Sequence, residues 1–126
     1  MSEQFERGLK VRREVMGDAF VDKAFGEATD FTRPFQEFVT EHAWGTVWNR
    51  DGLDRKTRSF ITLAMLAALG RSQELKGHVR GALNNGASIE EIREVLIHAA
   101  IYAGVPMSIE AMRAANEVIS QLQERM

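Results

Sequence analysis

The sequence predicts an all-α fold, a compact bundle of six to seven helices. No segment shows the sustained alternation of polar and apolar residues that marks a half-buried strand. Apolar residues instead recur three and four positions apart, in segments that end at glycine. The 126 residues contain no repeat or linker, so we expect a single domain spanning residues 1–126.

The first half of the chain is expected to contain three helices and an irregular segment. Residues 3–16 have a broad apolar arc, and a shorter helix follows over 18–26. A third helix begins near Pro34, because proline in the first turn lacks only an amide that would be unpaired anyway. Residues 43–53 show no helical period and are predicted to form a loop.

Arg12 interrupts the apolar arc of the first predicted helix. We expect its aliphatic stem to pack on the core while the guanidinium reaches water. Contact with a bound anion is the alternative interpretation.

The second half is expected to contain four helices. The first of them starts after Asp54 and is apolar nearly all round from 60 to 69, which predicts burial on several sides. The last runs from Pro106 to about Gln123. The helix over 88–103 has no polar face in its second half, so it lies in the centre of the fold or at a subunit interface.

Local signals separate the two middle helices of this half. Asn85-Gly86 predicts a helix end, because the residue after a helix often turns left-handed and glycine does so freely. Ser88 followed three residues later by Glu91 is a capping box that starts the next helix.

Composition excludes several function classes. The net charge of −2 favours neither nucleic acid nor an anionic membrane as a partner. The absence of cysteine excludes disulfides, thiolate metal sites and thiol redox catalysis. The N-terminus shows no apolar signal segment, and the longest apolar run is only half a membrane span. We therefore expect a cytoplasmic protein.

Glu74 and His78 are the leading catalytic candidates. A carboxylate four residues before an imidazole on one helix face can orient the ring and raise its basicity. The small residues Gly77, Gly81 and Ala82 beside them leave room for a ligand. The alternative is a structural ion pair on a helix.

His98 and Tyr102 repeat this spacing behind Glu94 on the following helix. Taken alone, His98 is better explained as a histidine with a purely structural role. The three histidines at 42, 78 and 98 have no close ligand spacing, so a metal site is the weaker interpretation.

Cations and tryptophans supply further candidates for substrate binding. Three basic residues at 55, 56 and 58 oppose the dipole of their helix, which suggests either anion binding or simple solvation. Arg58 and Arg71 suit a carboxylate, because guanidinium offers two parallel donors. Trp44 could equally pack in the hydrophobic core or line a ligand pocket. Trp48 lies close to Arg50 in the sequence, which favours a ligand site or a subunit contact for this residue.

Five motifs carry a resemblance to a known family: Glu74-Leu-x-x-His78-Val, Asn84-Asn-Gly86, Tyr102-Ala-Gly-Val-Pro106, Trp44-Gly-x-Val-Trp48 and Thr57-Arg-Ser59. Together they resemble the carboxymuconolactone decarboxylase family, which shares the alkyl hydroperoxidase D-like fold, and the resemblance covers roughly residues 5–122. The hydroperoxidase pattern has two cysteines where this chain has Arg71 and Glu74. That departure excludes thiol peroxidase activity.

The resemblance implies a carboxy-lyase that converts 4-carboxymuconolactone to 3-oxoadipate enol-lactone and CO₂ in protocatechuate catabolism, without a cofactor. The substrate would be a lactone dicarboxylate, and the assembly a homo-oligomer, a hexamer of three dimers. In this interpretation His78, held by Glu74, delivers a proton, and Arg58 or Arg71 anchors a carboxylate. His98 and Tyr102 are candidate donors to the oxyanion, and Trp48 is a candidate contact of the substrate.

Two alternatives stay open. The first is a related lactone or β-keto acid decarboxylase with the same residues. The second is a helical oligomer that binds a small acid without catalysis, in which Arg71, Glu74 and His78 form an ion-pair cluster at a subunit contact.

Overall fold

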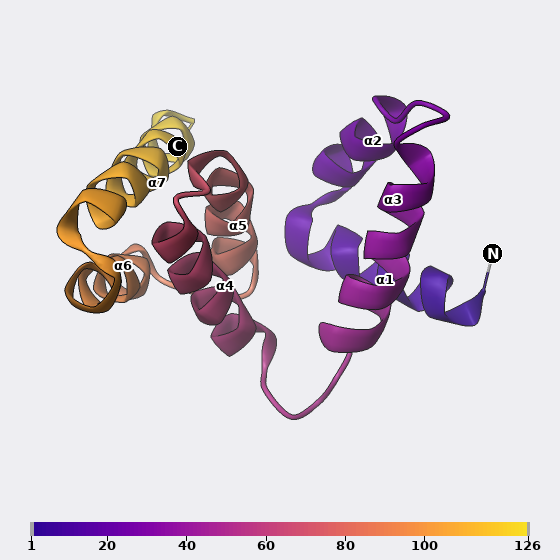
Figure 1. Cartoon of the computed structure of the whole chain (residues 1–126), viewed down its shortest axis with the longest axis horizontal. Helices are drawn as coiled ribbons and strands as arrows, with labels where there is room; N and C mark the ends of the chain where they lie inside the picture. Colours follow the sequence, from indigo (N-terminus) through magenta and orange to yellow (C-terminus); the bar gives the residue numbers. More distant parts are fainter. Residues whose placement is uncertain (1, 126) are drawn as a thin grey trace. The chain divides into compact units, whose positions relative to one another are not determined.

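The computed structural model describes residues 2–125, which are mostly helical and contain no strand (Figure 1). The all-α prediction is confirmed. The elements are α1 (Glu3–Met16), α2 (Asp18–Gly26), α3 (Arg33–Val39), the π-helix η1 (Thr40–Val47), α4 (Arg55–Leu69), α5 (Ser72–Asn84), α6 (Ile89–Ala103) and α7 (Val105–Glu124). Among the described residues, no helix is long and apolar enough to cross a membrane.

The chain forms two compact units, each with its own hydrophobic core. The N-terminal unit ends at Arg55 and contains α1, α2, α3 and η1. The C-terminal unit begins at Lys56 and contains almost all of α4 together with α5, α6 and α7.

Helix α1 packs closely against η1 in the N-terminal unit. Gly8 and Gly45 are buried where the two backbones meet, and an added Cβ at Gly8 would lie 2.7 Å from the Gly45 nitrogen. Trp44 and Trp48 stack with ring centroids 4.8 Å apart, inside the core that Val11, Val15 and Met16 complete. Glycine at the crossing therefore permits the contact that covers both indoles.

The segment predicted as a loop is helical for half of its length. Trp44 lies within the π-helix Thr40–Val47, and Trp48 is its C-cap residue. The expectation of a loop over 43–53 was wrong for residues 43–47. A π-helix has more residues per turn than an α-helix, so its apolar residues do not recur at the 3.6-residue period that predicts a helix.

Arg12 is buried rather than solvated, so the expectation for its guanidinium was wrong. Its Nη1 donates a hydrogen bond to Thr40 Oγ1 at 3.0 Å. The guanidinium carbon also lies 6.0 Å from the ring centre of Phe20 and 5.9 Å from that of Phe25. Burial lowers the pKa of Arg12, because desolvation disfavours its charged form.

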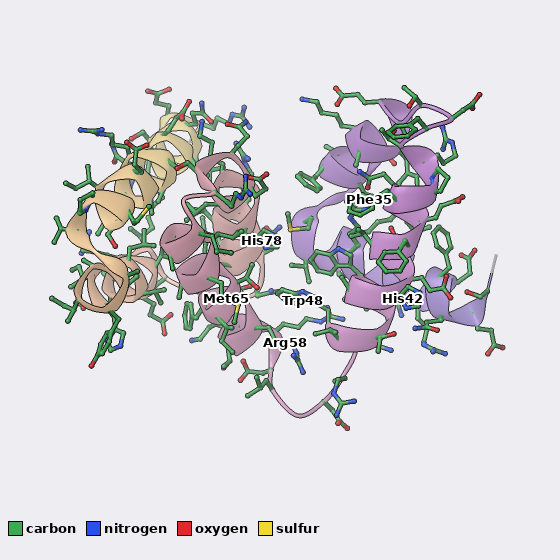
Figure 2. The ribbon with its side chains drawn as sticks, in the orientation of Figure 1. Phe35, His42, Trp48, Arg58, Met65 and His78 are labelled. Carbon is green, nitrogen blue, oxygen red and sulfur yellow. The ribbon has the colours of Figure 1, made fainter. Side chains whose placement is uncertain are left out.

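An aromatic stripe lies on the surface of the same unit (Figure 2). Phe35 and Phe38 stack with centroids 6.5 Å apart, and Phe38 lies 4.6 Å from the His42 ring. Both phenylalanines are exposed.

The core of the C-terminal unit contains side chains from all four of its helices. Its most buried large members are Leu63, Leu75, Val79, Ile92, Leu96 and Val118. The predicted boundary between α5 and α6 is confirmed. Gly86 has φ 93°, and the Ala87 amide donates to the Ala82 carbonyl at 2.9 Å, which completes a Schellman helix end. Ser88 and Glu91 form the predicted capping box.

Helices α4 and α6 are less buried than their apolar sequences predict. Each buries one stripe, around Leu63 in α4 and Leu96 in α6. Met65 is 60 % exposed and Ile101 is 77 % exposed. The expectation that α4 is buried on several sides was therefore wrong for the isolated chain. For α6, the exposed second half is consistent with the alternative that this helix lies at a subunit interface.

Candidate functional site

The candidate proton donor lies on α5, between its buried and its exposed faces. Leu75 and Val79 are fully buried, and the buried glycines at 77 and 81 let neighbouring groups approach the backbone. His78 follows Gly77 and is half-buried, with its Nδ1 atom shielded from solvent. Figure 2 shows the ring projecting from α5. A histidine placed in this way can present its other ring edge, which carries Nε2, to a bound molecule.

Glu74 lies one turn before His78, as predicted, but it is exposed. Among the residues described, its carboxylate takes part in no ion pair or hydrogen bond. The predicted orientation of the His78 ring by Glu74 therefore has no contact to support it in this structure.

Two arginines were predicted to anchor substrate carboxylates. Arg58 is half-buried in α4, and Figure 2 labels both Arg58 and His78. Arg71 is exposed and is the N-cap residue of α5, where its backbone amide donates to the Leu66 carbonyl at 2.9 Å. Both arginines lie in the C-terminal unit, as His78 does.

The other two cations at the start of α4 have carboxylate partners. Arg55 Nη1 lies 2.7 Å from Glu14 Oε2, and Lys56 Nζ lies 3.1 Å from Glu91 Oε2. These ion pairs account for two of the three basic residues that oppose the helix dipole.

His98 and Tyr102 lie together on α6, with stacked rings 5.0 Å apart. Both are exposed and line a shallow hollow of about 370 Å³. Its other lining residues are alanines of α4 and α6: Ala64, Ala68, Ala99 and Ala103. None of His78, Glu74, Arg58 and Arg71 lines this hollow, so the structure groups the His98–Tyr102 pair apart from them.

Trp48 belongs to the core of the N-terminal unit and is 9 % exposed. This placement gives Trp44 and Trp48 a clear structural role. A contact between Trp48 and substrate remains a prediction.

Sequence reasoning missed one polar contact near the candidate residues. Asn85 Nδ2 donates a hydrogen bond to the buried Ser59 Oγ at 2.9 Å, which links the end of α5 to α4. The sequence places Asn85 at the helix end, in one stripe with Glu74 and His78, but no local pattern indicates a partner 26 residues away. Among the described residues, no group of three or more histidine or acidic side chains is arranged to hold a metal ion.

The chain belongs to the Carboxymuconolactone decarboxylase family, whose sequence profile matches residues 33–117. This match confirms the family resemblance. The chain is 49 % identical over 121 residues to nitrosuccinic acid decarboxylase of Metarhizium robertsii, covering 96 % of this chain and 85 % of the relative. It is 44 % identical over 120 residues to 4-carboxymuconolactone decarboxylase of Acinetobacter baylyi, covering 95 % of this chain and 90 % of the relative. The predicted enzyme class, a carboxy-lyase, is confirmed.

Proposed function

We propose that this protein decarboxylates 4-carboxymuconolactone to 3-oxoadipate enol-lactone and CO₂ without a cofactor. The observation that carries the proposal is the 44 % identity, over 95 % of the chain, to a 4-carboxymuconolactone decarboxylase. This reaction would place the protein in the breakdown of protocatechuate and related aromatic acids.

The chemistry explains why no cofactor is needed. The departing carboxylate is attached to a carbon vinylogous to the lactone carbonyl, so its bonding electrons move into that carbonyl as CO₂ leaves. The enzyme must then stabilise the resulting oxyanion and protonate the carbon next to the carbonyl. His78 is the proposed acid, because its Nδ1 is buried and its ring is only half-covered.

The substrate keeps a second carboxylate, which requires a fixed cation. Arg58 is the first choice, since it is half-buried in α4 and its guanidinium can offer two parallel donors to a carboxylate. Arg71, at the start of the helix that carries His78, is the alternative. Glu74 is proposed as an orienting group that reaches His78 only when substrate is bound, and His98, Tyr102 and Trp48 have weaker support as substrate contacts.

Nitrosuccinate is the second candidate substrate, because the relative that acts on it is 49 % identical to this chain. The nitro group of nitrosuccinate accepts the electron pair left by CO₂, as the lactone carbonyl does. Both substrates therefore pair a leaving carboxylate with an electron sink and keep a second carboxylate. The sink is on the same carbon in nitrosuccinate and is reached through a C=C bond in the lactone. The two substrates differ in where the proton is added. The nitro compound is protonated at the carbon that lost CO₂, and the lactone at the carbon next to its carbonyl.

The test is CO₂ release from freshly made 4-carboxymuconolactone and from nitrosuccinate, each with EDTA present. Faster turnover of the lactone, with deuterium from D₂O at the carbon next to its carbonyl, supports the proposal. Turnover of nitrosuccinate alone reassigns the substrate. If neither substrate releases CO₂, the alternative of a small-acid-binding protein is favoured. Activity lost with EDTA and restored by zinc would establish a metal requirement.

We also propose that the protein is a homo-oligomer, a hexamer in line with the family resemblance. The support is an apolar surface on α6 and α7, where Ile97, Ile101, Val105 and Ile109 are each more than 40 % exposed. They line a hollow of about 400 Å³. Contiguous apolar surface of this kind is typical of a protein interface.

A further inference from the structure

The start of α4 is held by side chains from the two helices that follow it. Asn85, the C-cap residue of α5, donates to Ser59 Oγ at 2.9 Å. Ser59 is 1 % exposed and Asn85 is half-buried, so this hydrogen bond is partly shielded from water. A buried hydroxyl that lost this donor would incur a desolvation penalty.

An ion pair joins the first turn of α4 to the start of α6. Lys56 Nζ lies 3.1 Å from Glu91 Oε2, and the Glu91 carboxylate also accepts the Ser88 amide at 3.0 Å. Lys56, which makes the ion pair, and Ser59, which accepts the hydrogen bond, lie on either side of Arg58 in the sequence. They restrict the movement of the turn that carries Arg58.

Asn85 and His78 lie on the same face of α5. Seven residues are close to two helical turns, which separate the two positions by about 10 Å along the axis. The Asn85–Ser59 bond therefore connects the helix that carries His78 to the residue next to Arg58. Both groups proposed to contact the substrate belong to helices that this one bond joins.

We propose that Asn85 is a positioning residue, which acts through Ser59 to hold the Arg58 guanidinium in register with the His78 ring. The inference rests on the proposed function, in which Arg58 holds the retained carboxylate and His78 delivers the proton. Two side chains that contact one small dicarboxylate must keep a fixed separation. A displacement of either by about 1 Å can cost about 10²-fold in rate. Loss of the bond lets α4 and α5 shift while both remain helical.

The test compares Asn85→Ala and Ser59→Ala with Asn116→Ala, a control that removes an exposed asparagine of α7. Thermal unfolding and circular dichroism show whether each variant is folded. We expect kcat/KM for decarboxylation to fall about 10- to 100-fold in either site variant, and to be unchanged in the control. The double variant should lose no more than one single variant, because both substitutions remove the same bond.

A second cycle separates positioning from a purely structural role. If Asn85 acts through Arg58, Asn85→Ala should have little further effect on kcat/KM once Arg58→Ala is present. Full additivity of these two changes, or a lower Tm with unchanged kcat/KM, would overturn the inference while leaving the proposed function intact. Failure of the wild-type protein to release CO₂ from either substrate would overturn both.

Discussion

Gly8 and Gly45 lie against each other where α1 crosses η1, and neither position has space for a side chain. A Cβ at Gly8 would overlap the Thr40 carbonyl oxygen, and one at Gly45 would overlap the Gln4 carbonyl oxygen. Backbone atoms cannot move aside as a flexible side chain can. The crossing therefore depends on both glycines.

Gly8→Ala should destabilise the protein by about 3 kcal/mol or more, at the upper end of overpacking costs. Denaturant unfolding of the full chain measures the change. Gly26→Ala is the matched control, because this exposed helical glycine has nothing within 4 Å of an added Cβ. The control should be neutral or stabilising by less than about 1 kcal/mol. Equal stability of the two variants would show that the crossing is not tightly packed.

Arg12 should tolerate methionine better than lysine. Among the described residues it has no carboxylate partner, and its charge is buried against Thr40, Phe20 and Phe25. Methionine fills similar space without a charge to desolvate, whereas lysine keeps the charge but loses the planar donor geometry. We expect Arg12→Lys to lower stability by about 1–3 kcal/mol and Arg12→Met by less. A greater loss in Arg12→Met, measured by urea unfolding, would show that the cation itself stabilises the unit.

Glu91 should make stability depend on pH in the acid range. Hydrogen bonding to the Ser88 backbone, followed by Lys56, holds the pKa of the Glu91 carboxyl below its ordinary value. Because the folded-state pKa is the lower one, this stabilisation is present above the unfolded-state pKa and is lost as the pH falls through the folded-state pKa. Glu91→Gln should therefore be less stable than wild type at pH 7, and the difference should shrink below about pH 4.

Urea midpoints measured between about pH 3 and pH 7 test this, with Glu90→Gln as an exposed control on the same turn. A difference between Glu91→Gln and wild type that grows as the pH falls would contradict the assignment.

Ile101 tests the proposed assembly surface. It is 77 % exposed on α6, and a charge there would be buried without a partner if a second copy covers it. We expect Ile101→Glu to shift the oligomer towards a smaller species in light scattering, while Gln121→Glu, an exposed change on α7, does not. A wild-type monomer at micromolar concentration, or an unchanged mass in Ile101→Glu, would remove this surface from the account.

Local chemistry made much of the fold predictable. Gly86 and Ser88 signal the boundary between α5 and α6 through backbone conformation and capping, which depend on only a few neighbouring residues. The π-helix and the buried Arg12 could not be predicted in this way. Both involve contact between α1 and η1, and the Arg12–Thr40 hydrogen bond joins residues 28 positions apart in sequence.

The candidate site was predictable to the same extent. Helical periodicity placed His78 at the edge of the buried stripe that contains Leu75 and Val79. Periodicity does not say which edge other helices cover, so it could not show that Glu74 is exposed. It also could not show that His98 lines a different hollow.

The most direct test of the central claim is the rate of CO₂ release from 4-carboxymuconolactone by wild type and His78→Ala, with His42→Ala as control. His42 is an exposed histidine of the N-terminal unit that has no part in the proposed site. If His78 supplies the proton, its replacement should lower kcat by about 10²- to 10⁴-fold with the oligomer intact, and the control should keep its activity. Full turnover by a folded His78→Ala variant would contradict the account and place the proton donor elsewhere.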